Sequence, residues 1–315
     1  MKNKVILIIG GTGALGKTLI EKYHRNNTII VFSRDEHKHY HLQKQYPNVT
    51  SIVGNIREKN SVMNVLIRFN PEVVINAAAL KHVPICEDNP YESVKTNIIG
   101  HQNVIECVGL HKNIESLIFV STDKACKPIN VYGMCKSISE QLYVSFAKQQ
   151  RDTKVVMVRY GNVLESTGSV IPYFKQLLED GSDHLPITHF DMTRFLLTLD
   201  QAVELIDWAY NFPQSHGKIA VPKVKSMRVV DLANSLIKYY RKEDKVELKE
   251  IGIRSGEKLH EEMISTEEWL RTQEWQNYLI TSERHNNKLW SYSSENSLLD
   301  DDEIYSFLQN SGVIK

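Results

Sequence analysis

The sequence predicts an α/β protein: a Rossmann-type, doubly wound parallel sheet with a smaller C-terminal α/β domain. Three observations lead to this prediction. An apolar run over residues 5–9 is followed at once by a glycine-rich turn. Strand-like and helix-like segments then alternate to about residue 161, which is typical of a parallel sheet covered by helices on both faces. After Asn162, glycines and prolines interrupt this alternation.

The elements of the larger domain follow in order along the chain. Short apolar runs predict strands over residues 5–9, 28–32, 50–53, 72–77, 114–120 and 154–160. Helices are predicted between them, over residues 14–23, 58–69, 91–110 and 130–150. The sequence therefore assigns residues 1–163 to a dinucleotide-binding domain, to which later segments can return.

A different pattern predicts the second domain. Gly168, Pro172, Gly181 and Pro186 are expected to break the chain. A helix near residues 201–210, a strand near 218–221 and a helix near 229–240 follow. We assign residues 164–282 to a substrate-binding domain that closes over the cofactor. Residues 283–315 form a polar tail with a short helix near 304–308, and the sequence gives this tail no role.

Glycines at positions 10, 13 and 16 form the turn between the first strand and the first helix. The first glycine allows the tight turn, the second lets backbone N–H groups approach a pyrophosphate, and the third lets helix and strand pack closely. Glycines that merely make a turn are the alternative. The position between a strand and a helix favours dinucleotide binding by Gly10, Thr12, Gly13, Ala14, Leu15 and Gly16.

The end of the second predicted strand indicates which dinucleotide is bound. An acidic residue there would bind the ribose hydroxyls of NAD, but this strand ends in Ser33 and Arg34. A guanidinium suits a 2′-phosphate, and Lys38 adds a second cation. Asp35, one position further on, favours NAD instead. We expect NADP rather than NAD.

The composition favours a soluble cytoplasmic enzyme. The chain has 38 Lys and Arg against 38 Asp and Glu, so no nucleic-acid or membrane-surface partner is expected. No apolar stretch approaches a membrane span of about 20 residues, and the first strand leaves no room for a signal peptide. The four cysteines show no C-x-x-C spacing, which fits a reducing compartment. His37, His39 and His41 lack a carboxylate or cysteine partner at suitable spacing, so no metal site is expected.

Polar side chains gather where the fifth predicted strand meets the next helix. Ser121, Thr122, Asp123 and Lys124 follow the strand directly. Tyr132 and Lys136 are four residues apart on the helix, so their side chains share one face. A solvated loop before an ordinary helix is the alternative, and a lone Tyr-x-x-x-Lys pair would favour it. With the glycine turn at the other end of the domain, this cluster instead indicates an active site, because open α/β sheets place chemistry at the carboxyl ends of their strands.

These motifs identify a resemblance. The chain resembles the extended short-chain dehydrogenases/reductases, and within them the inverting UDP-N-acetylglucosamine 4,6-dehydratases of surface-sugar synthesis. The resemblance covers nearly the whole chain. Its motifs lie, in order, at residues 10–16, 33–36, 77–84, 95–97, 121–124, 130–133, 159–163, 192–195 and 256–261. Asn55 departs from the aspartate usual in this family, which concerns cofactor contact rather than chemistry.

The resemblance implies a reaction and a role for each residue of the cluster. Water is lost across C5–C6 of the hexose through a transient C4 ketone, with inversion at C5. Tyr132 takes the C4 hydroxyl proton, with Lys136 as the cation that makes its phenol ionise. Lys124, made neutral, is the base at C5. Asp123, protonated, is the acid at C6, and Thr122 holds the sugar O4. The product is the UDP-linked 2-acetamido-2,6-dideoxy-L-arabino-hex-4-ulose.

Further contacts are implied in the same way. A recycled, tightly held NADP, a UDP-sugar and a homo-oligomer are expected. Cofactor contacts beyond those above are Asn55, Ile56, Ala77, Ala78, Lys81, Ser121 and Val163. Substrate contacts are Lys81, Thr122, Asn162, Thr167, Gly168, Ser169, Val170, Thr188, Arg194, Arg254 and Glu257. Arginine suits a diphosphate because its planar fork donates two hydrogen bonds.

Three alternatives remain open from the residues. A UDP-glucose 4,6-dehydratase would use the same groups on a different sugar. A nucleotide-sugar C4 epimerase would need only Tyr132 and Lys136. A non-catalytic NADP-binding regulator would keep the glycine turn and tolerate loss of Tyr132.

Overall fold

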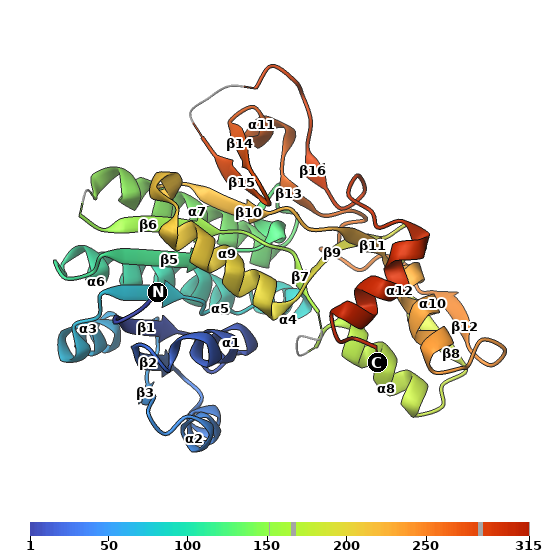
Figure 1. Cartoon of the computed structure of the whole chain (residues 1–315), viewed down its shortest axis with the longest axis horizontal. Coiled ribbons are helices and arrows are strands. Elements are labelled where there is room, and N and C mark those ends of the chain that lie inside the picture. The colour runs from blue at the N-terminus through green and yellow to red at the C-terminus, as the bar shows by residue number, and fades with distance from the viewer. Residues whose placement is uncertain (151, 165–167, 283–285, 315) are drawn as a thin grey trace.

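A nine-stranded sheet forms the centre of the larger domain in the computed structural model, which describes residues 1–150, 152–164, 168–282 and 286–314 (Figure 1). The strand order is β14-β15-β10-β6-β5-β4-β1-β2-β3. The parallel strands are β1 (Val5–Ile9), β2 (Thr28–Ser33), β3 (Thr50–Val53), β4 (Val73–Asn76), β5 (Ser116–Val120), β6 (Lys154–Val158) and β10 (Ile219–Pro222). The predicted doubly wound parallel sheet is confirmed.

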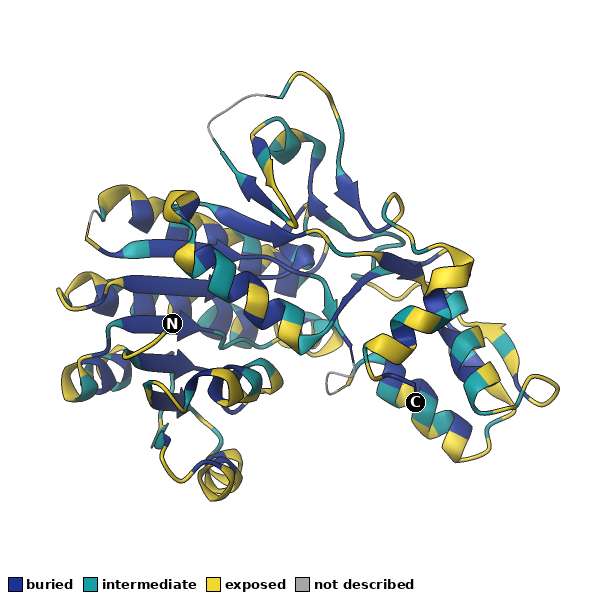
Figure 2. Cartoon of the chain, viewed as in Figure 1, coloured by how far each residue is buried: buried dark blue, intermediate teal, exposed yellow. Residues whose placement is uncertain are grey.

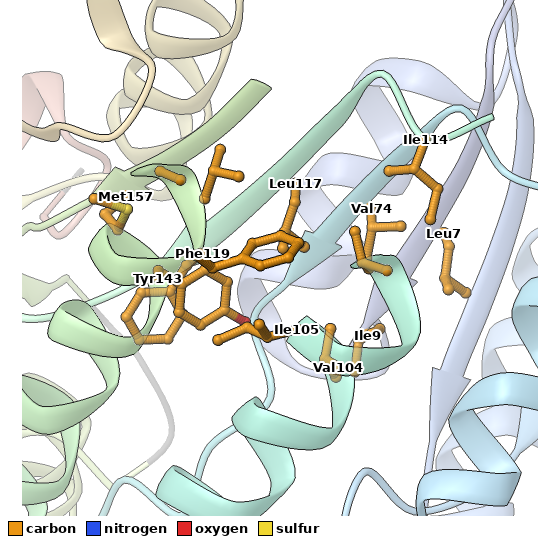
Figure 3. Close-up of a cluster of buried hydrophobic side chains, with 14 of the residues drawn as sticks. Leu7, Ile9, Val74, Val104, Ile105, Ile114, Leu117, Phe119, Tyr143 and Met157 are labelled. Carbon is orange, nitrogen blue, oxygen red and sulfur yellow. The ribbon is translucent and has the colours of Figure 1, made fainter. Parts of the chain in front are cut away.

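Helices cover both faces of this sheet. They are α1 (Ala14–Tyr23), α2 (Glu36–Gln45) and α9 (Leu199–Asn211) against one face, and α3 (Lys59–Phe69), α6 (Gly100–Gly109) and α7 (Val131–Gln149) against the other. Alternate side chains of β1 serve the two faces, as the two-residue period of a strand requires. Leu7 and Ile9 join one buried cluster (Figure 3), whereas Ile6 and Ile8 join the other. Figure 2 shows the strands buried and the helices exposed on their outer sides.

The predicted helix over residues 91–110 is interrupted. It consists of α5 (Pro90–Val94), a π-helical turn η1 (Lys95–Ile99) and α6. Within this turn, the Asn97 amide donates to the Leu80 carbonyl at 2.8 Å and accepts from the Leu80 N–H at 2.9 Å. The wider turn therefore fixes the loop after β4, and π-turns of this kind are frequent at functional sites.

The smaller domain lies at one end of the large sheet (Figure 1). It contains α8 (Val170–Glu179), α10 (Val229–Tyr239), α12 (Asp301–Asn310), the pair β8 (His184–Ile187) and β12 (Glu247–Glu250), and the sheet β11 (Ser226–Arg228)-β9 (Thr193–Leu197)-β7 (Asn162–Val163). The expected chain break at Pro172 is wrong. Pro172 lies in the first turn of α8, where no proline N–H is needed.

The C-terminal third of the chain returns to the large sheet. After β10, the antiparallel hairpin β14 (Thr272–Trp275)–β15 (Tyr278–Thr281) extends the sheet edge. A short pair of strands, β13 (Glu262–Ile264) and β16 (Tyr292–Ser293), lies beside α11 (Thr266–Trp269). The tail then packs on the smaller domain, where Ile304 and Leu308 of α12 are buried. The large sheet therefore draws on chain beyond residue 163.

Short helices complete the fold: α4 (Val83–Asp88), the 3₁₀ turn η2 (Asp123–Ala125) and η3 (Pro213–Ser215). Over the described ranges, none of the helices combines the length and the apolar character needed to cross a membrane.

Candidate active site

A cleft of about 1420 Å³ lies between the two domains. On one side it is lined by residues that follow the carboxyl ends of strands, such as Gly10 after β1, Ser33 at the end of β2 and Ser121 after β5. On the other side it is lined by the smaller domain, including Thr188 and Arg254. The cleft therefore occupies the place where open α/β sheets bind ligands.

The glycine turn forms one end of this cleft. Gly10 has a φ of +80°, and a Cβ there would lie 2.8 Å from the Ala78 nitrogen. A Cβ on Gly16 would overlap the backbone of Gly11. Gly13, the N-cap residue of helix α1, provides no side-chain cap, which leaves the N–H groups of the first turn for a ligand. This turn fits the pyrophosphate of a dinucleotide.

Ser33, Arg34, Asp35 and Lys38 all line the cleft at the end of β2. The Asp35 carboxylate caps α2 by accepting the Lys38 N–H at 3.0 Å, and it pairs with the Lys38 ammonium at 3.3 Å. These contacts, the backbone hydrogen bond first, lower the pKa of Asp35. Arg34 donates no hydrogen bond to another part of the described chain. Its guanidinium is therefore available to a ligand.

Lys136 is buried and lies in the lining of the cleft. Its ammonium donates to the Val120 carbonyl at 2.6 Å and lies 4.0 Å from the centre of the Phe119 ring. Burial lowers the pKa of Lys136 to about 7. Burial, and next the charge of Asp123, raises the pKa of Tyr132. Lys136 is directed at the strand in this structure, and its expected role in making Tyr132 ionise stays a prediction.

Asp123 and Lys124 form an ion pair on the turn η2. The Lys124 ammonium lies 3.0 Å from Asp123 Oδ1, which also accepts the Thr122 hydroxyl at 2.9 Å. Asp123 is fully buried and does not line the cleft, whereas Thr122 and Lys124 do. Burial raises the pKa of Asp123, in the direction that its expected role as an acid needs.

Lys124 differs from the expectation of a neutral base. Burial alone would lower its pKa, but the carboxylates of Asp123 and Glu261 outweigh burial and raise it. Lys124 is therefore charged in this structure. The Glu261 carboxylate lies 3.3 Å from the Lys124 ammonium, and the sequence did not indicate this contact.

Three polar atoms on the substrate side of the cleft are buried without a hydrogen bond within the described chain: Asn162 Oδ1, Ser169 Oγ and Glu257 Oε2. All three residues were predicted as substrate contacts. A buried polar atom without a partner is unfavourable, so these atoms suit a polar ligand. Arg194 also lines the cleft, but it already donates to the carbonyls of Thr193, Lys258 and Leu259.

Of the other predicted site residues that the structure describes, all but one line the cleft: Gly10, Thr12, Gly13, Ala14, Leu15, Gly16, Ile56, Ala77, Ala78, Lys81, Ser121, Val163, Gly168, Val170, Thr188 and Arg254. The exception is Asn55, whose amide oxygen accepts the Arg57 N–H at 3.1 Å. Thr167 lies outside the described residues.

Comparison with known proteins places this geometry in a family. Residues 6–283 match the model of the family described as "Polysaccharide biosynthesis protein". The chain belongs to this family. A UDP-N-acetylglucosamine 4,6-dehydratase (inverting) of Campylobacter jejuni is 42% identical over 89% of this chain and 83% of that protein. The resemblance drawn from the motifs is thereby confirmed.

Two further proteins are similar to this chain. A UDP-glucose 4-epimerase of Rickettsia bellii is 36% identical over 88% of this chain and 82% of that protein. The X-ray structure of Pen from Bacillus thuringiensis has a TM-score of 0.91 and 32% identity, covering 99% of each chain. The Bacillus thuringiensis protein therefore has the same fold as this chain over nearly its whole length.

Gly133 allows helix α7 to lie close against the turn η2. A Cβ at this position of α7 would overlap the Lys124 carbonyl oxygen. Gly133→Ala is therefore expected to push η2 away from Tyr132 and to slow product formation about 10²-fold, because small displacements of reacting groups have effects of that size. Turnover and thermal unfolding should be measured together, with Gln141→Ala on the exposed face of the same helix as the control. Wild-type turnover in Gly133→Ala would contradict this account of the contact.

Proposed function

We propose that this protein is an inverting UDP-N-acetylglucosamine 4,6-dehydratase. The observation that carries the proposal is the contact between Asp123 and Lys124 at the wall of the cleft that also holds Tyr132. An epimerase needs a group for oxidation at C4 but no acid and base for water loss. This site offers Tyr132 for the oxidation, and Asp123 and Lys124 as the acid and base for water loss.

The chemistry begins at C4 of the sugar. Only a C4 ketone makes the C5 proton acidic enough to remove, so oxidation comes before elimination. A nicotinamide held in the cleft by the glycine turn would supply the hydride acceptor for this oxidation and the hydride donor for the final reduction at C6. Tyr132 lines the cleft and takes the C4 hydroxyl proton as a phenolate, once its own phenol proton has been passed on. Lys136, with a pKa of about 7 from burial, can exchange a proton near neutral pH.

Elimination then uses the Asp123–Lys124 pair. Lys124 takes the proton from C5, the C5–H electrons form the C5–C6 double bond, and the C6 hydroxyl leaves as water with the Asp123 proton. This step starts from neutral lysine and protonated aspartic acid. That form and the observed ion pair hold the same number of protons and differ by one transfer across 3.0 Å. The charged Lys124 is therefore compatible with the proposed role.

Asp123 has an approach to the cleft in spite of its burial. Its Oδ2 atom has no hydrogen bond within the described chain. This atom lies 3.5 Å from the point where Gly161, which lines the cleft, would carry a Cβ. Because Gly161 has no side chain of its own, Asp123 Oδ2 lies against the bare backbone of the cleft wall, and a turn of the carboxyl group would bring it towards the substrate.

Proton NMR of the purified protein with UDP-N-acetylglucosamine in deuterated water tests the proposal. A new C6 methyl signal, deuterium at C5 and L-arabino couplings are expected without added cofactor. The same methyl with D-xylo couplings would contradict inversion. A C4 epimer without a methyl would favour the epimerase. Absence of any product would contradict the N-acetyl substrate, and UDP-glucose would be tried next.

We further propose NADP as the cofactor, supported by the free Arg34 guanidinium and by Asp35, whose carboxylate caps α2. Arg34→Ala is expected to weaken NADP binding about 10- to 100-fold, because a hydrogen bond to a charged group contributes about 1.5–3 kcal/mol. NAD binding should change little. Titration calorimetry of both cofactors checks this, with Lys44→Ala near the other end of α2 as the control. Equal losses for both cofactors, or a wild-type preference for NAD, would contradict the proposal.

The C4 epimerase is the second candidate, because the Rickettsia bellii relative bears that name. It would leave Asp123 and Lys124 without a chemical role. A regulator that binds NADP without turnover would leave Tyr132 without one.

We also propose that the protein acts as a cytoplasmic homo-oligomer. Its four cysteines are free and buried, which suits a reducing compartment. Tyr91, Ile99, Met134 and Ile138 are exposed apolar side chains on the contacting elements α5, η1 and α7. A second copy that covers them would remove this surface from water, and light scattering of the purified protein tests it.

A further inference from the structure

Glu261 is a buried carboxylate that contacts Lys124 without lining the cleft. Its side chain is 3% exposed, and its Oε1 atom lies 3.3 Å from the Lys124 ammonium. Lys124 lines the cleft and is 19% exposed. Through Lys124, the cleft is therefore connected to a charge that a substrate does not meet directly.

The backbone of Glu261 is fixed from two directions. Its N–H donates to the Ser294 hydroxyl at 2.9 Å, and its carbonyl accepts the Ser294 N–H at 2.8 Å. Arg194 donates to the carbonyls of Lys258 and Leu259, just before it in the chain. The carboxylate is thus held beside Lys124 by contacts that do not involve Lys124.

Five charged groups face one another here: Asp123, Lys124, Arg194, Lys258 and Glu261. The Lys258 ammonium lies 3.8 Å from Glu261 Oε2, an atom that has no hydrogen bond within the described chain. Burial would raise the pKa of Glu261, but the charges of Lys124, Arg194 and Lys258 outweigh burial and lower it. Glu261 is therefore ionised, and its charge acts on both members of the catalytic pair.

We propose that Glu261 is a positioning residue for dehydration, which holds the Lys124 ammonium against the cleft wall and sets the pH range in which the Asp123–Lys124 pair carries a single proton. This inference rests on the proposed dehydratase function. It assigns a task to a residue that does not itself line the cleft.

The sign of the effect follows from the charge. The pair holds one proton between the pKa of Asp123 and the pKa of Lys124. The negative charge of Glu261 favours the protonated form of each group, so it raises both pKa values. Glu261→Gln removes that charge and lowers both. The whole bell-shaped pH profile of turnover should therefore move to lower pH, by about one unit or more.

The test compares Glu261→Gln with Glu262→Gln, a neighbour that pairs with Lys127 at 3.2 Å instead. Turnover is followed by the C6 methyl signal across the pH range. The pKa of Lys124 is followed separately by ¹⁵N NMR of labelled lysine, with Lys124→Arg to assign the signal. Glu261→Asp, which keeps the charge on a shorter side chain, should slow turnover but leave the profile near its wild-type position.

The inference is supported if both limbs of the pH profile move to lower pH and the pKa of Lys124 falls in Glu261→Gln but not in Glu262→Gln. A slower enzyme with an unmoved profile would overturn it, and so would an unchanged Lys124 pKa. If Glu261→Gln does not fold, Glu261→Asp decides instead. A shift of its pH profile to lower pH, although the negative charge is kept, would overturn the inference. A wild-type protein that forms no methyl product refutes the dehydratase, whereas the lysine titration still decides the charge coupling independently.

Discussion

Lys124→Ala should stop water loss while leaving the cofactor in place. A positioned acid or base contributes about 10²- to 10⁴-fold to turnover, so a loss of that size is expected. The substitution also leaves the carboxylates of Asp123 and Glu261 without their shared cation. The glycine turn follows β1 and Lys124 follows β5, with β4 between the two strands, so cofactor binding should persist. Methyl formation by NMR and the absorbance of bound cofactor measure the two effects separately.

Lys127→Ala is the matched control for this experiment. Lys127 lies three residues further along the chain, is 45% exposed and pairs with Glu262 rather than with the catalytic cluster. Its turnover should match the wild type. Undiminished dehydration in Lys124→Ala would refute the proposed base, and a C4 epimer as the wild-type product would favour the epimerase instead.

Arg159→Met is expected to cause the largest loss of stability. Arg159 is 1% exposed and makes two hydrogen bonds to Glu140, at 3.0 and 2.7 Å, and two to Glu268, both at 2.8 Å. Removing one partner of a buried ion pair costs about 3–5 kcal/mol, because the remaining charges stay buried without compensation. Denaturant unfolding should show a loss of that size in the free energy of unfolding.

The control is Arg228→Met, which breaks an exposed pair with Asp231. Exposed pairs contribute about 0–1 kcal/mol, so little change is expected. If Arg159→Met cost no more than this control, the buried network would have no net structural role.

Acid unfolding gives a second measure of the same network. Burial alone would raise the pKa of Glu268, but Arg159 outweighs burial and lowers it to about 2. A glutamate in the unfolded chain has a pKa of about 4.3. The stabilisation is therefore fully present above that pH and is lost as pH falls towards 2. Arg159→Met should flatten the dependence of stability on pH in this window.

Local signals explain what the sequence could predict. The apolar run of β1, the glycines that follow it and the four-residue spacing of Tyr132 and Lys136 each depend on neighbours in the chain. Their structures agree with the prediction, because strand period, turn geometry and helix period are short-range properties. The residues that line the cleft could be predicted in the same way, because the carboxyl ends of parallel strands meet at one edge of the sheet.

Contacts between distant segments explain what the sequence could not predict. The π-turn around Asn97 exists because its amide binds the backbone of Leu80, on another loop. The charge of Lys124 depends on Glu261, which lay in a recognised motif but had no assigned partner. The direction of Lys136 depends on a strand carbonyl, that of Val120. No periodicity in the chain encodes such pairings.

The Arg159–Glu268 pair has a consequence for synthesis on the ribosome. Its partners are separated by 109 residues, and Glu268 leaves the ribosome long after the dinucleotide turn is complete. Until then a nascent domain would bury an arginine with only part of its counter-charge. Early folding intermediates should therefore expose this region and depend on chaperones. A chain that ended before Glu268 would lack this counter-charge altogether and should be less stable than the full chain.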